Sequence, residues 1–473
     1  MALKKTLIAA HLILLSLLAL SCRREAGISS PNLIVIMCDD LGYADVGFNG
    51  CTDIPTPNID RIANEGLRFS NGYVTYSVCS PSRAGFITGR YGQRYGYERN
   101  AQYQPGDSLM GLPQDEKTLA EVLSTSAYTS GIIGKWHLGA HISNHPLNRG
   151  FDEFYGHLGG GHTYFPENLT IEDSYSINTE RESYRTYIMH NHEAVKTTGY
   201  LTDEFSRQAL RFVEKHREEA FFLYLSYNAP HGPLEATEKY LSRFTNIEDE
   251  KRRCYAAMVS AVDDGVGALL NSLEAFGLEE NTIVVFLSDN GGPETKNASD
   301  NGVLREGKGS VYEGGFHVPF AMKWEGVLSP GVYEHPVSSL DIFATITSLN
   351  QTPLNPEKPL DGVNLIPFLT GEDHSLPHEA IYLRKYDDRK FAVRAGDYKI
   401  VTHDNADIKE LYNLEEDIGE TLDLAEVYPR KLERLDSIRK AWNEELMPPA
   451  FLGLIHRDTW GWKKRTNEIY KVK

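Results

Sequence analysis

The sequence predicts an α/β fold in which a large, doubly wound, mixed or parallel sheet is sandwiched by helices. A smaller antiparallel sheet with one helix follows at the C-terminal end. Two observations lead to this prediction. Runs that are apolar throughout alternate with helical patterns, as in sheets whose strands are buried on both faces. Beyond about residue 370 the chain changes to short strand-like pieces separated by Gly and Asp turns.

The apolar runs account for the main strands, and polar residues follow each of them. The runs occupy residues 32–37, 130–134, 221–226 and 282–287. Apolar residues at helical spacing predict the intervening helices at residues 118–123, 203–215 and 255–278. Because strand carboxyl ends in such a sheet meet at one edge, the polar residues that follow them are expected to form one site.

The chain is expected to divide into a catalytic domain, residues 30–370, and a C-terminal subdomain, residues 371–473. The strands predicted in the subdomain are 380–383, 391–394, 398–401 and 410–413, and the helix is 429–445. Residues 162–199 are polar and weakly periodic, which predicts a loop insertion over the site.

Residues 1–22 have the pattern of an export signal. Lys4 and Lys5 precede an apolar run, residues 6–20, that is too short to span a bilayer comfortably. The segment Ala19-Leu20-Ser21-Cys22 resembles a bacterial lipobox. We therefore expect export to the periplasm or cell envelope with a lipid anchor at Cys22, and simple signal-peptide cleavage is the alternative.

The composition narrows the classes of partner. A formal net charge of −18 argues against nucleic acid and anionic membrane surfaces as partners. An anionic substrate would need positive charge concentrated in a cleft. The chain has 5 cysteines, and if Cys22 is acylated and Cys79 modified, the odd remainder argues against a disulfide framework.

A candidate nucleophile lies in the segment Cys79-Ser80-Pro81-Ser82-Arg83, which Thr88-Gly89-Arg90 follows. We expect Arg83 and Arg90 to place two guanidinium groups near Cys79. Guanidinium geometry matches tetrahedral oxyanions such as sulfate and phosphate. The residues around Cys79 leave its role open. Besides a nucleophile for such an oxyanion ester, Cys79 could be a disulfide partner, a thiolate nucleophile or a metal-binding cysteine.

Oxygen ligands follow two of the predicted strands. Asp39 and Asp40 come after one run, and Asp289 and Asn290 come after another. Carboxylate and amide oxygens suit a hard cation such as Ca²⁺, and the lack of soft ligands argues against zinc. The alternative is that both pairs are only helix caps or turn residues.

Basic residues complete the candidate site. Lys135 and His137 are two residues apart, so on an extended segment they can face the same side. A lysine supplies a point charge for an anionic oxygen, and a histidine can move a proton near neutral pH. His231 follows a third apolar run, and Lys308 lies in a glycine-rich segment.

These segments together resemble the sulfatase family. The stretch at Cys79 matches the family's Cys-x-Pro-Ser-Arg and Leu-Thr-Gly-Arg motif, with Ile87 in place of Leu. Residues 134–139 match its Gly-Lys-Trp-His-Leu-Gly element, and residues 229–233 match its Ala-Pro-His-x-Pro segment. Residues 304–319 resemble its lysine loop, although His317 stands where the family usually has Arg. The resemblance covers nearly all of residues 30–450.

The resemblance implies a mechanism and a set of partners. A maturation enzyme would oxidise Cys79 to formylglycine, and Arg83, Lys135, His137, His231 and Lys308 would be the other catalytic residues. Asp39, Asp40, Asp289 and Asn290 would bind Ca²⁺, with residue 79 as a further ligand. The expected substrate is a sulfated glycan: a glycosaminoglycan, a mucin glycan or an algal polysaccharide.

Other interpretations and a second set of substrate contacts remain. A phosphodiesterase or phosphonate hydrolase of the alkaline-phosphatase superfamily is the alternative enzyme. A non-catalytic glycan-binding lipoprotein is a third interpretation. Such a protein is expected to lack the nucleophile or the lysines, and this sequence retains them.

His162 and Tyr164 are expected either to contact sugar hydroxyls or to pack within their loop.

Overall fold

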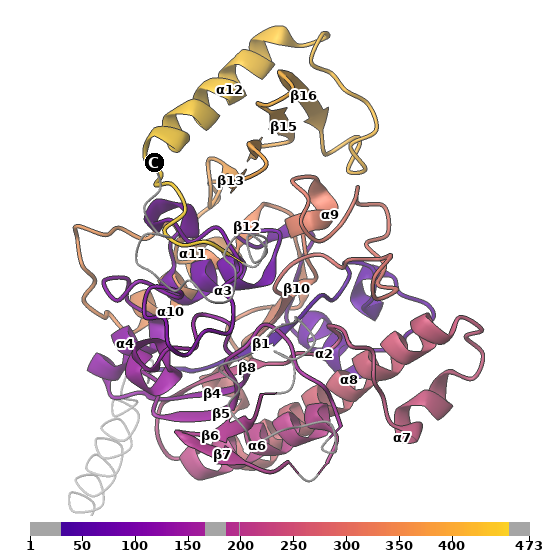
Figure 1. The fold of residues 1–473 in the computed structure, drawn as a ribbon, viewed down its shortest axis with the longest axis vertical. Coiled ribbons are helices and arrows are strands. Elements are labelled where there is room, and N and C mark those ends of the chain that lie inside the picture. Colours follow the sequence, from indigo (N-terminus) through magenta and orange to yellow (C-terminus); the bar gives the residue numbers. More distant parts are fainter. Residues whose placement is uncertain (1–29, 166–185, 198, 454–473) are drawn as a thin grey trace, which may run out of the picture.

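The computed structural model describes residues 30–165, 186–197 and 199–453. The predicted export signal and lipobox, residues 1–22, lie outside the described residues, as does the middle of the predicted insertion. Figure 1 shows a large sheet between layers of helices, with a small sheet and helix α12 at the C-terminal end of the described chain.

Within the described residues, the central sheet has ten strands in the order β11-β2-β10-β9-β1-β8-β4-β5-β6-β7. Its parallel centre consists of β9 (Thr282–Ser288), β1 (Asn32–Cys38), β8 (Phe221–Ser226), β4 (Thr129–Lys135) and β5 (Glu153–His157). The predicted strands are therefore confirmed, and they are adjacent in the sheet.

The two edges make the sheet mixed. At one edge, β10 (Phe320–Lys323) runs antiparallel to β9, and β2 (Leu67–Phe69) and β11 (Gly331–Tyr333) follow. At the other edge, β6 (Ile188–His190) and β7 (Glu193–Val195) pair antiparallel beyond β5. The expectation of a loop insertion over residues 162–199 is thus wrong for β6 and β7, which extend the sheet.

Side-chain alternation along β1 divides the core into two layers. Leu33, Val35 and Met37 join one hydrophobic cluster, whereas Ile34 and Ile36 join the other. Successive strand residues point to opposite faces, so a run that is apolar throughout requires helices on both faces.

Helices cover both faces of the central sheet. The cluster around Ile34 includes residues of α2 (Pro57–Asn64), α6 (Leu201–His216), α7 (Glu238–Leu241) and α8 (Glu250–Phe276). The cluster around Leu33 includes residues of α3 (Cys79–Thr88), α4 (Leu119–Leu123), α9 (Glu313–Phe316) and α10 (Leu340–Leu349), and partly buried residues of α11 (Ile366–Leu369) pack against it. Two short strands, β3 (Gly72–Tyr73) and β12 (Val337–Ser338), pair with each other.

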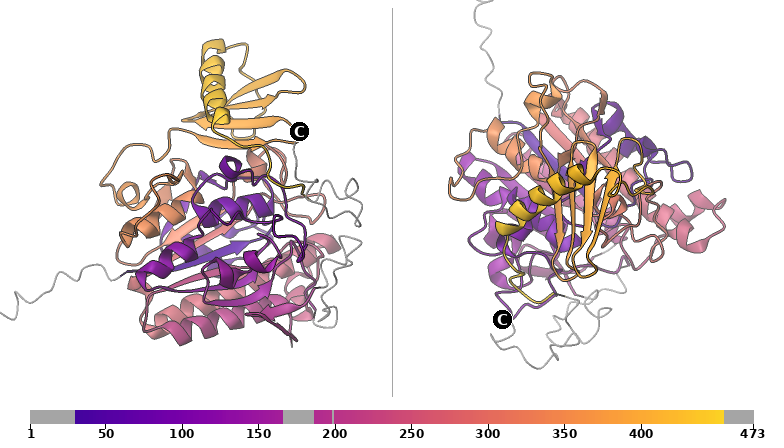
Figure 2. Two further views of the ribbon diagram at one scale, coloured as in Figure 1. Left: turned by 60° about the vertical axis from the view of Figure 1, so that its left-hand side comes forward. Right: turned by 90° about the horizontal axis from the view of Figure 1, so that it is seen from above.

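The C-terminal part has the predicted antiparallel sheet and helix. Within the described residues it contains β13 (Ile381–Lys385), β14 (Lys390–Ala395), β15 (Tyr398–His403), β16 (Ile408–Asn413) and α12 (Pro429–Glu444). Val393, Ile400 and Leu411 pack with Leu435 of α12, which lies along the outer side of this sheet in Figure 2. Among the described helices, none is both long and apolar enough to cross a membrane.

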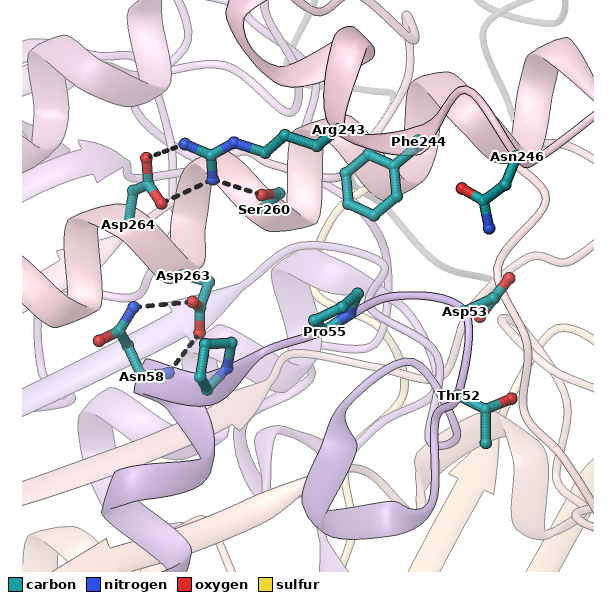
Figure 3. Close-up of a pocket in the computed structure, with 11 residues that line it drawn as sticks. Thr52, Asp53, Pro55, Asn58, Arg243, Phe244, Asn246, Ser260, Asp263 and Asp264 are labelled. Carbon is teal, nitrogen blue, oxygen red and sulfur yellow. Dashed lines mark hydrogen bonds and ion pairs between the residues drawn. The ribbon is translucent and has the colours of Figure 1, made fainter.

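Helix α8 fixes the start of α2. The Asp263 carboxylate accepts hydrogen bonds from the backbone N–H groups of Asn58 (2.9 Å) and Ile59 (2.8 Å), which begin α2. The next residue, Asp264, forms an ion pair with Arg243. Asp263, Asp264 and Arg243 all line a pocket of about 320 Å³ (Figure 3). None of the predicted catalytic residues lines this pocket.

We therefore expect Asp263→Ala to lower the free energy of unfolding by about 1–3 kcal/mol, because it leaves buried N–H groups without an acceptor. Asp264→Ala is the matched control and should cost at most about 1 kcal/mol, because its ion pair is partly exposed. Urea unfolding of both variants measures the difference, and equal losses would contradict this account of α2.

Candidate active site

The carboxyl ends of the central strands bring the predicted polar residues together. Asp39 and Asp40 follow β1, Asp289 and Asn290 follow β9, and Lys135 ends β4. Backbone hydrogen bonds hold these ends in place: Asp289 N–H donates to Cys38 O (3.0 Å), and Asp39 N–H donates to Ala229 O (3.1 Å). The predicted polar residues therefore do lie together, at the carboxyl ends of the central strands.

Cys79 is the first residue of α3, and it lies within this group. Its S–H donates to Asp39 Oδ1 at 3.3 Å, and Lys308 Nζ donates to its Sγ at 3.1 Å. Burial, with a further contribution from Asp39, raises the pKa of the Cys79 thiol to about 12, against the influence of Lys135. The surrounding protein groups thus favour the neutral thiol, whereas a thiolate nucleophile needs a lowered pKa.

The acidic residues form a compact, buried cluster. One ligand atom from each of Asp39, Asp40, Cys79 and Asp289 lies within 4.8 Å of all the others. Asn290 Nδ2 donates to Asp40 Oδ1 (2.7 Å), while within the described part of the chain its buried Oδ1 has no hydrogen-bond partner. An unpartnered amide oxygen beside several carboxylates is an environment that fits a hard cation.

Each carboxylate of this cluster is paired with a cation. Lys135 Nζ donates to Asp39 Oδ2 (2.6 Å), and Lys308 Nζ lies 2.7 Å from Asp40 Oδ1. Arg83 Nε donates to Asp289 Oδ2 at 2.8 Å. These pairs offset the cost of removing charged groups from water.

The pKa values of the cluster reflect burial and charge together. Burial raises the pKa of Asp39, but Lys135 and His231 outweigh it and hold this pKa well below its usual range. Burial, together with Asp39, raises the pKa of Asp289 to about 6 despite Arg83. Burial lowers the pKa of Lys308, but Asp40 and Cys79 raise it well above its usual value.

The two predicted arginines have different positions. Arg83 is fully buried, and besides Asp289 it donates to Ser226 Oγ at 2.5 Å. Its contacts make it a residue that holds Asp289 in place. Arg90 was expected near Cys79, and this expectation is wrong: its side chain forms an ion pair with Glu116 (2.6 Å) and donates to Pro359 O. Helix α3 ends at Gly89 in the left-handed conformation, which turns the chain before Arg90.

The backbone of His137 is left-handed. Its φ is 56°, so the expectation of an extended segment from Lys135 to His137 is wrong at the histidine. The N–H groups of Trp136 and His137 still donate to His157 O (3.0 Å) and Leu158 O (3.3 Å) beside β5.

The Nε2 atom of His137 lies 3.1 Å from Ala101 O, and Ser80 Oγ donates to the backbone oxygen of His137 at 2.6 Å. Burial, Lys135 and Arg83 lower the pKa of His137 well below its usual value, which leaves a neutral imidazole able to accept a proton.

His231 lies at the mouth of the cluster. Its Nε2 is 3.6 Å from Asp40 Oδ2, and its Nδ1 is 2.7 Å from Gly232 O. Tyr164, which sequence analysis assigned to substrate contact or packing, has a positioning role: its hydroxyl contacts Asn228 O (2.7 Å) and His231 O (2.8 Å).

The other loop residue, His162, belongs to the packing. It is buried, and its ring nitrogens contact the backbone oxygens of Thr163 (3.0 Å) and Thr186 (2.7 Å). The interpretation of His162 as a packing residue is therefore the one that its contacts favour.

His317, in the place where the family usually has Arg, contacts an acidic side chain and a backbone oxygen. Its Nδ1 lies 3.0 Å from Glu313 Oε2, and its Nε2 lies 2.9 Å from Ser70 O. Glu313 is not among the site residues predicted from the sequence. The only sequence signal for it is an acidic residue between Tyr312 and Gly314, in the segment that carries Lys308.

Comparison with known proteins agrees with this geometry. Residues 31–351 match the family model described as Sulfatase, and residues 307–447 match the one described as N-sulphoglucosamine sulphohydrolase, C-terminal. The chain belongs to the sulfatase family. This sulfatase is 33% identical over 410 residues to N-acetylgalactosamine-6-sulfatase of Mus musculus, covering 83% of this chain and 75% of the relative.

Solved structures extend the similarity to the whole fold. The crystal structure of Ps i-CgsB, also solved in complex with k-i-k-neocarrahexaose, is 37% identical with a TM-score of 0.84. That match covers 94% of this chain and 100% of the other. The phosphonate monoester hydrolase of Agrobacterium radiobacter, at 18% identity, 88% of this chain, 96% of that chain and a TM-score of 0.64, shares the fold alone.

These relationships establish the class of reaction. The chain is a sulfuric ester hydrolase, and its family characteristically uses formylglycine and a metal ion. The acidic cluster beside Cys79 provides a suitable place for such an ion.

The different positions of the two arginines can be tested directly. We expect Arg83→Lys to lower kcat about tenfold or more, because lysine cannot contact Asp289 and Ser226 with one planar group. Arg90→Lys, the matched control, should keep kcat within about twofold, because Arg90 contacts Glu116 and Pro359 instead. Rates on an aryl sulfate measure both effects. A larger loss for Arg90→Lys would refute the assignment.

Proposed function

We propose that this sulfatase removes sulfate from sulfated carbohydrates, such as glycosaminoglycans, mucin glycans or algal glycans, using formylglycine formed from Cys79 and a bound Ca²⁺. The observation that carries the proposal is the position of residue 79, which contacts both Asp39 and Lys308. The carbohydrate class is supported by the relatives, one named for N-acetylgalactosamine and one crystallised with a neocarrahexaose.

The proposed residue roles follow from the site geometry. When present, the hydrated aldehyde at residue 79 supplies a hydroxyl nucleophile, and the cation supplies positive charge at the sulfate oxygens. Lys308 and His231, at the mouth of the cluster, bind the leaving oxygen and give it a proton. His137, neutral and in contact with Ser80 at the start of α3, would accept the proton of the second hydroxyl of residue 79 as sulfate leaves and the aldehyde forms again. Lys135 and Arg83 hold Asp39 and Asp289.

Calcium and formylglycine are linked in this proposal. With an unmodified thiol, Asp39, Cys79 and His231 form a mixed oxygen, sulfur and nitrogen set that would suit a softer metal such as zinc. Conversion of the thiol to an oxygen-bearing group leaves Asp39, Asp40, Asp289, Asn290 and residue 79 as oxygen ligands. Such a set favours Ca²⁺.

Biogenesis and location complete the proposal. A formylglycine-generating maturation enzyme acts as a partner during synthesis. The chain is exported to the bacterial periplasm or cell envelope, with a lipid anchor at Cys22. The resemblance of residues 19–22 to a lipobox supports the anchor, and mass spectrometry of the mature N-terminus tests it.

For the nucleophile, we expect protein made together with a maturation enzyme to carry formylglycine at residue 79, with activity proportional to the modified fraction. Cys79→Ala should lower turnover by about a thousandfold or more, because it removes the nucleophile. Peptide mass spectrometry and a panel of regiospecifically sulfated saccharides measure both. Cys51→Ser, at a half-buried thiol paired with Asp53, is the control and should remain active. Fully active protein with only unmodified Cys79 would refute the proposal.

For the metal, we expect one Ca²⁺ per active chain. Asp289→Asn should weaken Ca²⁺ binding by about tenfold or more and lower activity in parallel, because it removes a negative ligand. Calcium titration and metal analysis provide the measurement, with Asp264→Ala as a control carboxylate outside the cluster. Active protein that contains stoichiometric zinc and no calcium would overturn the assignment.

A further inference from the structure

The loop that carries Lys308 is held from outside by the C-terminal sheet. We propose that this sheet positions Lys308 at the leaving oxygen, with Lys399 and Arg305 as the positioning residues. The inference rests on the proposed function, because it concerns how Lys308 performs its part in that reaction.

Lys308 depends on an accurate placement. Its Nζ lies 2.7 Å from Asp40 Oδ1 and 3.1 Å from Cys79 Sγ, so a small displacement of the loop breaks both contacts. Hydrogen bonds close the loop on itself, because Ser310 N–H donates to Gly307 O and Gly314 N–H donates to Arg305 O, both at 2.9 Å. The closed loop moves as a unit, so its placement relative to Asp40 and Cys79 depends on contacts with neighbouring elements.

A buried ion cluster provides the first of these contacts. Lys399 Nζ, from β15, lies 2.8 Å from Glu313 Oε1 and 2.8 Å from Glu420 Oε1, and all these side chains are fully buried. Glu313 is the first residue of α9, directly after the loop, and its N–H donates to Glu420 Oε2 at 2.7 Å. Lys399 of the C-terminal sheet thus holds the Glu313 side chain at the end of the loop, and Glu420, in the segment after β16, holds the Glu313 backbone.

Stability alone does not account for this cluster. Well-packed apolar residues of similar volume often stabilise a protein as well as buried ion pairs do, because charges lose solvation on burial. What charged groups add is geometry: Glu313 also accepts hydrogen bonds from Tyr73 OH (2.7 Å) and His317 Nδ1 (3.0 Å). These donors leave the Glu313 carboxylate a single well-defined position.

Arg305 provides a second contact, three residues before the catalytic lysine. Its guanidinium lies 3.7 Å from the centre of the Tyr312 ring and donates to Tyr412 OH and Glu420 O, both at 2.9 Å. Tyr412 belongs to β16, so this arginine connects the loop to the sheet directly.

The residue after Lys308 is held as well. Lys385 Nζ, at the end of β13, donates to Gly309 O, and Gly309 N–H donates to Ser77 O at 2.7 Å. Three residues of the loop are therefore held by strands of the C-terminal sheet: Arg305 before the catalytic lysine, Gly309 directly after it, and Glu313 at the end of the loop.

The test compares two substrates that differ in the need for leaving-group assistance. An aryl leaving group is a weaker base and needs less help than a sugar hydroxyl. Four variants of the mature, calcium-loaded enzyme are compared: Lys308→Ala, Arg305→Ala, Lys399→Met and the control Lys409→Met. Lys409 lies on the same sheet but pairs with Asp436 on the α12 side.

We expect Lys308→Ala to lower kcat on a sugar sulfate at least about tenfold more than on an aryl sulfate. Arg305→Ala and Lys399→Met should change this ratio in the same direction, with formylglycine and calcium contents unchanged. Lys409→Met should keep the wild-type ratio. A purely structural role would lower both rates equally, through the fraction of folded enzyme.

The outcomes separate this inference from the proposed function. Lys399→Met leaves Glu313 and Glu420 buried without a cationic partner and could prevent folding. In that case the result for Arg305→Ala is used, because Arg305 is half-exposed. A wild-type ratio in Arg305→Ala overturns the inference, as does a wild-type ratio in Lys308→Ala, while sulfate ester hydrolysis by the wild type still supports the proposed function. A mature wild type that hydrolyses neither substrate refutes both.

Discussion

The burial of several carboxylates at one sheet edge is the constraint on which the rest of this site depends. Asp39 and Asp289 are inaccessible to solvent, and Asp40 is nearly so. Uncompensated charges at such depth would destabilise the fold by several kcal/mol each. The chain therefore brings a cation to each acid from a different element: Lys135 from β4, Arg83 from α3 and Lys308 from the loop after β9. The same pairs that make burial tolerable also assemble the catalytic groups.

This balance explains how an acidic protein can accept an anionic ester. The chain has a formal net charge of −18, yet within the cluster the carboxylates and their cationic partners nearly cancel. A divalent cation bound among them would make the site positive, and burial would strengthen its attraction for sulfate. The overall charge disfavours nonspecific anions, whereas the site favours one that fits beside residue 79.

Local sequence patterns predicted the central strands and the polar residues at their carboxyl ends, because a buried parallel strand and the polar residues after it are adjacent in sequence. The role expected of Lys308 came instead from the resemblance to the sulfatase family. Predictions failed where the direction of a side chain depends on a local turn of the backbone, or where its partners are distant in sequence. The left-handed Gly89 turns Arg90 toward Glu116, and the backbone of His137 is left-handed just after β4. The cluster of Lys399, Glu313 and Glu420 joins segments about a hundred residues apart, and periodicity carries no information on such pairings.

Packing also shows why the C-terminal sheet can act on catalysis at all. Along β14 and β15, Val393 and Ile400 face α12, whereas Ala392 and Val401 join the same hydrophobic cluster as Leu33 of the central sheet. One face of the small sheet is therefore part of the catalytic core, and a displacement of either sheet is felt by the other because interiors are close-packed. The predicted boundary near residue 370 reflects a change in the sequence pattern, from long apolar runs to short strand-like pieces. The contacts that hold Lys308 cross this boundary, because they join residues between the end of β9 and Glu420.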